Sequence, residues 1–198
     1  MRAAQIIAIM GLSVSVGACA TGVPVTQRIA FGVTMASGEG GSGVVAGEAR
    51  VVAEKVNPRV PVEVSVETGT VAVHFAQGRE RGTLVRLDGT GTPVSSEESV
   101  PAGAPRAPTA GPVRVVLEHG RFIVCFRRGD TERGYRLMAQ AWTADGSPLG
   151  EPVQVSPPDA DVYSAPQVVA VDARRAMATF PAFSDGRFAL FAVPLELL

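Results

Sequence analysis

A twelve-residue pattern that occurs three times constrains the fold of this chain more than any other feature. The copies read VSVETGTVAVHF at residues 64–75, VVLEHGRFIVCF at 115–126 and VAVDARRAMATF at 169–180. Each copy has a proline three residues ahead of it, alternating apolar residues, an acidic residue in fourth place, a turn and a closing phenylalanine. Apolar residues with a period of two indicate a half-buried β-strand. Each copy is therefore predicted to be a β-hairpin.

The copies begin 51 and then 54 residues apart, which is the spacing of β-meander repeats and propeller blades. In the first two repeats the hairpin is followed by a charged loop, a third strand, an Asp-Gly turn and a weaker fourth strand. The third repeat ends after its third strand, at residues 188–193. Its first turn has Arg174 in place of glycine, so that turn must differ in type or carry strain.

Two further strands are predicted ahead of the repeats, at residues 28–35 and 44–54, as a hairpin around the Gly/Ser loop 36–43. Either strand could supply the missing fourth strand of the third repeat and close the structure end to end. We therefore predict an all-β fold of three propeller-blade-like meanders plus an N-terminal hairpin. Propellers usually have four to eight blades, so a β-sandwich or an irregular barrel is the alternative.

The return strands of the second and third repeats are apolar on both faces, as Ile123, Cys125 and Met177 show. Strands of this kind are predicted to be buried on both sides. Residues 140–155 (QAWTADGSPLGEPVQV) resemble the D-G-x-P-L-G…V unit of propeller-like repeats in bacterial secreted proteins. This resemblance implies a style of fold and no particular activity.

Residues 1–20 (MRAAQIIAIMGLSVSVGACA) have the layout of a secretory signal, with Arg2 ahead of an apolar stretch and small residues leading to Cys19. The run Val16-Gly17-Ala18-Cys19 resembles the lipobox of bacterial lipoprotein precursors.

The lipobox resemblance implies a signal peptide at residues 1–18, lipidation of Cys19, a lipidated tether at 19–27 and a single all-β domain at 28–198. Two or three acyl chains would anchor the protein stably, because one chain binds only marginally. The expected location is the bacterial cell envelope, at the outer rather than the inner membrane. Ala18-Cys19-Ala20 also fits an A-x-A cleavage site, which would make the protein secreted or periplasmic.

The charge and cysteine content exclude several classes of function. The net charge is −1, so the sequence has no electrostatic footprint for nucleic acid. With Cys19 lipidated, Cys125 is left alone and no disulfide is expected. Cys125 lies in an alternating strand and is interpreted as a small buried hydrophobe.

No pattern of catalytic or metal-binding residues is evident. The two histidines, His74 and His119, lie in different repeats without metal-site spacing. The motifs G-x-S-x-G, S-x-x-K and H-E-x-x-H are missing from the sequence. We therefore expect no catalytic residue, no metal site and no cofactor. Two acidic segments ahead of the second and third repeats leave an enzymatic alternative open, and they contain Glu97, Glu98, Asp159, Asp161 and Tyr163.

Charged loops follow the closing phenylalanine of the first two hairpins and are the predicted interaction loops. Their residues are Arg79, Glu80, Arg81, Arg127, Arg128, Asp130, Glu132 and Arg133. A solvated, salt-bridged rim is the alternative interpretation, since surface ion pairs are frequent and contribute little individually.

The sequence thus predicts a membrane-anchored envelope lipoprotein that acts as a non-catalytic binding or scaffold module for an envelope protein or polymer. One alternative is a hydrolase or lyase that acts on envelope polysaccharide through loop carboxylates. Another is an architectural subunit of a larger envelope complex, in which an unclosed sheet edge pairs with a partner strand.

Overall fold

The fold is all-β, as the sequence predicts. A computed structural model describes residues 43–58, 62–67, 69–76, 82–99 and 111–198. These residues form three antiparallel sheets and one short 3₁₀ turn, η1 (Glu118–Gly120). The predicted signal peptide, Cys19, the tether and the predicted strand at 28–35 lie outside the described residues.

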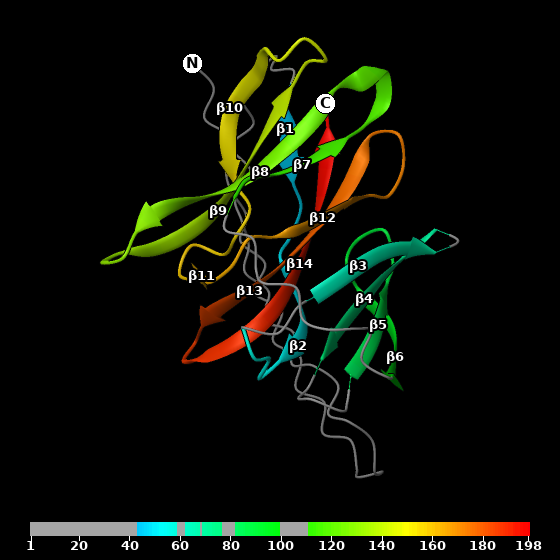
Figure 1. The fold of residues 1–198 in the computed structure, drawn as a ribbon, viewed down its shortest axis with the longest axis vertical. Helices are drawn as coiled ribbons and strands as arrows, with labels where there is room; N and C mark the ends of the chain where they lie inside the picture. The colour runs from blue at the N-terminus through cyan, green and yellow to red at the C-terminus, as the bar shows by residue number, and fades with distance from the viewer. Residues whose placement is uncertain (1–42, 59–61, 68, 77–81, 100–110) are drawn as a thin grey trace, which may run out of the picture.

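The first two sheets are four-stranded meanders in which each strand pairs with the next along the chain (Figure 1). The first sheet consists of β3 (Val62–Glu67), β4 (Thr70–Ala76), β5 (Gly82–Leu87) and β6 (Pro93–Ser99). The second sheet consists of β7 (Val113–Val116), β8 (Phe122–Asp130), β9 (Gly134–Trp142) and β10 (Pro148–Gln154). These are the first two predicted repeats, with their strands in the predicted order.

The third sheet is the third repeat, completed by a segment from the other end of the domain. Its repeat strands are β12 (Gln167–Ala170), β13 (Arg175–Ser184) and β14 (Arg187–Leu197). The short strand β11 (Asp161–Val162) also pairs with β13, beyond the end of β12. β1 (Val44–Ala46) and β2 (Arg50–Glu54) both pair with β14. The prediction that residues 44–54 supply the missing fourth strand is therefore confirmed.

A break at Gly47 divides this fourth strand in two. The Gly47 N–H donates to the Pro194 carbonyl oxygen at 2.8 Å, so the chain stays attached to β14 through the break. A Cβ at position 47 would lie 2.7 Å from the Pro194 Cγ, which is closer than real Cβ atoms approach a neighbour. Only glycine therefore lets the segment follow β14 past the proline ring.

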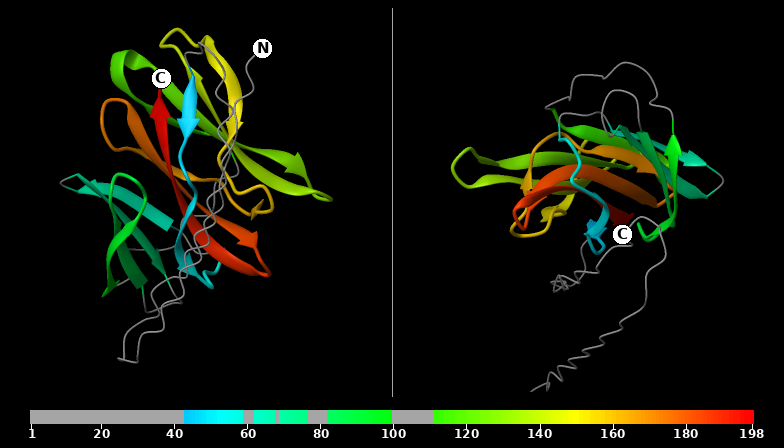
Figure 2. Two further views of the ribbon diagram at one scale, coloured as in Figure 1. Left: turned by 180° about the vertical axis from the view of Figure 1, so that it is seen from behind. Right: turned by 90° about the horizontal axis from the view of Figure 1, so that it is seen from below.

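The three sheets stack with the third in the middle (Figures 1 and 2). One core cluster joins the second sheet to the third and includes Ile123, Leu137 and Phe180. The other joins the third sheet to the first and includes Met177 and Val73. In the described part of the chain no core cluster joins the first sheet to the second. The stack is therefore open, and its two outer sheets each cover one face of the middle one.

This arrangement decides which strands are buried on both faces. Every residue of β13 from 176 to 182 is buried, which confirms the prediction for the third repeat. The same prediction is wrong for the second repeat, where Cys125 is buried but Phe122, Val124 and Phe126 are half-buried. Their face points away from the third sheet, and no other sheet covers it among the described residues.

The first turn of the third repeat was predicted either to differ in type from its glycine-containing counterparts or to carry strain, and it differs in type. The Asp172 Oδ1 atom accepts the backbone N–H groups of Arg174 at 3.0 Å and Arg175 at 2.8 Å. The backbone of Arg174 is not in the left-handed region. The Asp172 carboxylate thus organises the turn, and no glycine is needed.

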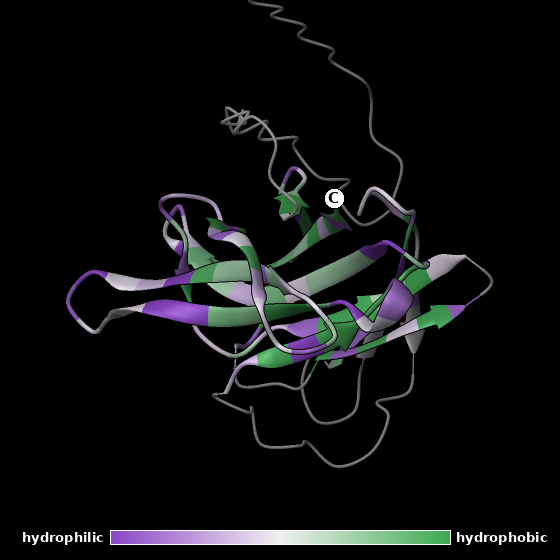
Figure 3. Ribbon diagram, turned by 90° about the horizontal axis from the view of Figure 1, so that it is seen from above, coloured by the Kyte–Doolittle hydropathy of each residue, from purple (hydrophilic) through white to green (hydrophobic). Residues whose placement is uncertain are grey.

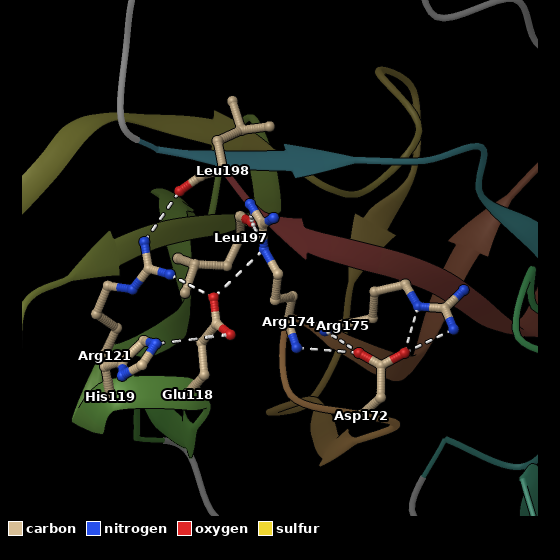
Figure 4. A network of polar contacts seen from close by, with 8 residues as sticks. All are labelled: Glu118, His119, Arg121, Asp172, Arg174, Arg175, Leu197 and Leu198. Atoms are coloured by element: carbon tan, nitrogen blue, oxygen red, sulfur yellow. Dashed lines mark hydrogen bonds and ion pairs between the residues drawn. The ribbon is translucent and has the colours of Figure 1, made fainter.

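Arg174 also ties the second sheet to the third (Figure 4). Its Nη2 and Nε donate to the Leu197 carbonyl oxygen at 2.9 and 3.2 Å, and its Nε lies 3.4 Å from the Glu118 Oε1. Arg121 donates to the same Glu118 oxygen at 2.6 Å and to the Leu198 carbonyl oxygen at 3.1 Å. One carboxylate therefore joins the η1 turn, the 171–175 turn and the end of β14.

Candidate interaction surface

The charged segment of the second repeat forms the end of a long hairpin, not a loop of seven residues. β8 and β9 stay in register to Asp130, which is opposite Gly134, so the turn comprises residues 131–133 alone. The prediction of a loop at Arg127, Arg128 and Asp130 is corrected in this respect. We call residues 127–136 the arm. The arm projects from the body, and its tip is the hydrophilic part (Figures 1 and 3).

Two glycines allow the strands of the arm to approach each other closely. Gly129 has a φ of 144°, and a Cβ there would lie 2.2 Å from the Gly134 carbonyl oxygen. A Cβ on Gly134 would lie 2.9 Å from the Asp161 carboxylate. A side chain at position 129 would force the two strands of the arm apart, and one at position 134 would push the arm away from Asp161.

Three side-chain contacts hold the arm against the β11 segment. The Tyr135 N–H donates to the Asp161 Oδ1 at 2.7 Å. The Arg127 Nη1 donates to the Tyr163 carbonyl oxygen at 2.9 Å, and its guanidinium lies 4.9 Å from the centre of the Tyr135 ring. The Arg136 Nη1 donates to the Ala160 carbonyl oxygen at 2.9 Å. Arg127 and Arg136 are thus engaged within the protein.

Arg128 is an outward cation near the tip of the arm. It is exposed, and the register places it directly opposite Arg136 on β9. Like charges in directly opposed positions destabilise a pair of strands. Glu132 and Arg133 are exposed at the tip. The positive charge of Arg128 therefore does not stabilise the hairpin that carries it.

Three aromatic rings lie beside the base of the arm, and sequence reasoning did not identify them as a group. The Phe188 ring contacts Tyr163 at 5.5 Å and Phe183 at 5.2 Å, with both pairs edge to face. Tyr163 is 46% exposed and Phe183 is 42% exposed. Exposed aromatic rings of this kind are enriched at sites of interaction. The available signal was the pair of phenylalanines that flank the Asp185-Gly186 turn.

The acidic residues that left an enzymatic alternative open are spread over two sheets. Glu97 and Glu98 lie in strand β6 and not in a loop, and Glu97 accepts a 2.6 Å hydrogen bond from Arg86. Asp161 accepts the Tyr135 N–H, and Asp159 lies 3.4 Å from the Ser184 hydroxyl. Within the described residues, no group of three His, Cys, Asp or Glu side chains could hold a metal ion.

The cysteine and the two histidines differ in their exposure. Cys125 is fully buried, and burial raises the pKa of its thiol to about 12. His74 is half-buried on β4, and His119 is exposed in the η1 turn with a φ of 54°. Arg79, Glu80 and Arg81 belong to a segment outside the described residues, so their loop stays a prediction.

The pKa values that depart clearly among the carboxyl groups belong to turn residues. Hydrogen bonds from the Arg175 side chain and from two backbone N–H groups lower the pKa of Asp172. A hydrogen bond from the Thr143 hydroxyl lowers the pKa of Asp145 in the same way. Burial would raise the pKa of Asp88, but hydrogen bonds from Thr90 and Thr92 together lower it. These carboxylates stabilise turns.

Comparisons with known proteins give one distant similarity. No model of a protein family matches the chain, and no curated protein matches it. Among solved structures, the chain is similar to a protein of unknown function from Dyadobacter fermentans DSM 18053, at 16% identity and a TM-score of 0.37. The match covers 73% of this chain and 41% of the other, so the chain spans less than half the length of that protein. In the part of the chain that is described, no helix is long and apolar enough to cross a membrane.

Proposed function

We propose that the chain is a membrane-anchored, non-catalytic binding module of the bacterial cell envelope. In this proposal Cys19 carries the lipid, and the arm contacts an anionic group on another envelope protein or on an envelope polymer. The supporting sequence observation is the run Val16-Gly17-Ala18-Cys19. The observation that carries the binding role is the exposed Arg128, held opposite another arginine on the β8–β9 hairpin.

The physical argument concerns the arginine pair. Opposite charges at directly opposed positions stabilise a hairpin by roughly 0.2–1 kcal/mol per pair, and like charges there destabilise it. Arg136 is used inside the protein, because it donates to the Ala160 carbonyl oxygen. Arg128 is exposed and adds repulsion, so its benefit is expected in a complex with an anion. Tyr163 and Phe183 offer apolar surface beside it.

The test of the binding role is a pull-down of the whole lipidated chain from its own envelope, comparing wild type with Arg128→Glu. The variant places Glu opposite Arg136, so it should keep or raise the stability of the hairpin by about 0.5 kcal/mol while weakening capture. Lys55→Glu is the matched control, because Lys55 is an exposed cation that directly follows β2 in the third sheet and is not part of the arm. Equal capture by Arg128→Glu and wild type would contradict the role of the arm.

The test of the anchor is metabolic labelling with radioactive palmitate. Wild type should incorporate the label and fractionate with the membrane. Cys19→Ser should do neither, because a thiol is required for acylation. Normal membrane retention of the Cys19→Ser variant would contradict the lipid anchor but would not bear on the binding role of the arm.

A further inference from the structure

The three repeats pack on one another by a single rule. In the second repeat, the ninth and eleventh residues of the hairpin, Ile123 and Cys125, enter the core that joins the second sheet to the third. They meet the tenth and twelfth residues of the third repeat, Ala178 and Phe180, which belong to the same core cluster. The odd-numbered face of one hairpin therefore packs on the even-numbered face of the next.

The second interface obeys the same rule. Met177, the ninth residue of the third repeat, lies in the core cluster that joins the third sheet to the first. The same cluster contains Val73 and Phe75, the tenth and twelfth residues of the first repeat. The order of packing is thus second sheet to third, and third to first.

Two faces at the ends of this series are left without a partner sheet in the described part of the chain. One is the odd-numbered face of the first sheet, which contains Ala72 and His74. The other is the even-numbered face of the second sheet, which contains Val124 and Phe126. If the packing rule continued, the odd-numbered face of a first sheet would pack on the even-numbered face of another second sheet.

The end face of the second sheet is apolar with a positive charge. We define it by the outward residues Arg114, Val116, Phe122, Val124, Phe126, Met138, Gln140 and Trp142. Phe122 and Trp142 are stacked with a centroid distance of 6.3 Å, and the Arg114 guanidinium lies 5.0 Å from the Phe122 ring centre. Val116 is 51% exposed. Its other apolar members, Phe122, Val124, Phe126, Met138 and Trp142, are half-buried. Apolar side chains that stay partly exposed on an uncovered sheet face mark a candidate interaction site.

The end face of the first sheet complements it in charge. We define it by the outward residues Glu63, Ser65, Glu67, Thr70, Ala72, His74, Leu84, Arg86, Ser95 and Glu97. Four of these ten residues are small, namely Ser65, Thr70, Ala72 and Ser95, and Ala72 is already buried among its neighbours. Arg86 lies 2.6 Å from Glu97 and 3.9 Å from Glu67, so one cation is shared between two of the three acids. The face therefore keeps a negative excess.

We infer that two copies of this chain associate through these end faces, each second sheet packing on the partner's first sheet. The complementary charges would steer this pairing over a contact between two identical faces. A two-fold axis makes both contacts equivalent and closes the assembly without free faces. The product is a ring of six sheets, within the four to eight blades that propellers use. This inference does not depend on the lipid anchor or on the arm.

The test is the oligomeric state of the whole chain in mild detergent, measured by light scattering over a range of concentrations. Wild type should be a dimer. Val116→Asp should raise the dimer dissociation constant at least about a hundredfold, because an unpaired charge would enter the interface. Val94→Asp is the matched control, since Val94 is 58% exposed and lies outside the paired outward positions of both faces. Because Val116 is half exposed, its substitution should leave the fold intact.

Glu63→Arg separates the proposed pairing from other dimers. It should weaken the dimer roughly tenfold, as should raised salt, because both remove charge complementarity. A wild type that stays monomeric at micromolar concentrations would overturn the inference. A dimer that loses stability with Val116→Asp but not with Glu63→Arg would overturn it too, because the second sheet would then pair with itself.

Discussion

Two phenylalanines on strand β13 give a direct test of the stacked sheets. Phe180 is fully buried between the second and third sheets and stacks on Phe191 at 5.7 Å, whereas Phe183 is 42% exposed near the end of the same strand. Truncating Phe180 to alanine forgoes roughly 150 Å² of burial, which at about 25 cal/mol per Å² amounts to ~4 kcal/mol. Phe180→Ala should therefore lower the free energy of unfolding by about 3–5 kcal/mol. Phe183→Ala should lower it by at most about 2 kcal/mol, because its site is open and no closed cavity forms.

The assay is urea unfolding followed by the fluorescence of Trp142, the single tryptophan of the chain. Both variants are compared at one protein concentration, because association stabilises the folded state by mass action. The slope with urea should be unchanged, so the midpoint reports the loss of stability. Equal losses for Phe180→Ala and Phe183→Ala would refute the placement of the second sheet on this face of β13.

Three further outcomes follow from individual sites. Gly129→Ala should lower the melting temperature well below that of the matched control Gly146→Ala. A Cβ at position 129 would lie 2.2 Å from the Gly134 carbonyl oxygen, whereas a Cβ at position 146 would have nothing within 4 Å. Equal shifts of the two variants in a thermal melt would contradict the close approach of the arm's strands. Asp172 has a pKa below its usual 3.8, so its carboxylate stabilises the folded state above about pH 4. This contribution is lost as the pH falls through the folded-state pKa, so Asp172→Asn should flatten the acid limb of a plot of stability against pH. An unchanged acid limb would contradict this role of Asp172. The Cys125 thiol, with its pKa raised to about 12, should resist iodoacetamide at pH 8 in the folded chain and react in urea. Rapid alkylation of Cys125 in the folded chain would show that the thiol is accessible and contradict its burial.

The strand order could be predicted because local signals agree with the fold. Alternating apolar residues mark the strands, and glycines at positions 69 and 146 adopt the positive φ that their turns need. The incomplete third repeat pointed to residues 28–35 or 44–54 as its missing strand, and residues 44–54 pair with β14. Short stretches of sequence specify the strands and the turns, whereas the pairing of residues 44–54 was inferred from the strand that the third repeat lacks.

Burial of the return strand on both faces was predicted correctly for β13 and wrongly for β8. Alternation shows that Val124 and Cys125 point to opposite faces, but it does not say which face a neighbouring sheet will cover. The charged residues Arg127 and Arg128 suggested a loop, although backbone pairing extends through them whatever their side chains. The aromatic group at the base of the arm forms because β11 pairs with β13, which brings Tyr163 beside Phe188.

Several polar contacts gather at one junction between the second and third sheets. Glu118 lies where the turns of two sheets and the end of β14 meet, and two arginines converge on one of its oxygens. Arg174, which breaks the glycine pattern of the repeats, provides the link to the third sheet. The departure from the repeat is therefore used in holding the sheets together.

The claim that the arm is the binding element is tested most directly by photo-crosslinking in the native envelope. A photo-reactive amino acid replaces Arg133 at the tip of the arm in one strain and Lys55, an exposed cation that is not part of the arm, in another. We expect a discrete or polymer-sized adduct from the arm position and none from position 55. No adduct from the arm, or adducts of equal yield from both positions, would contradict the account.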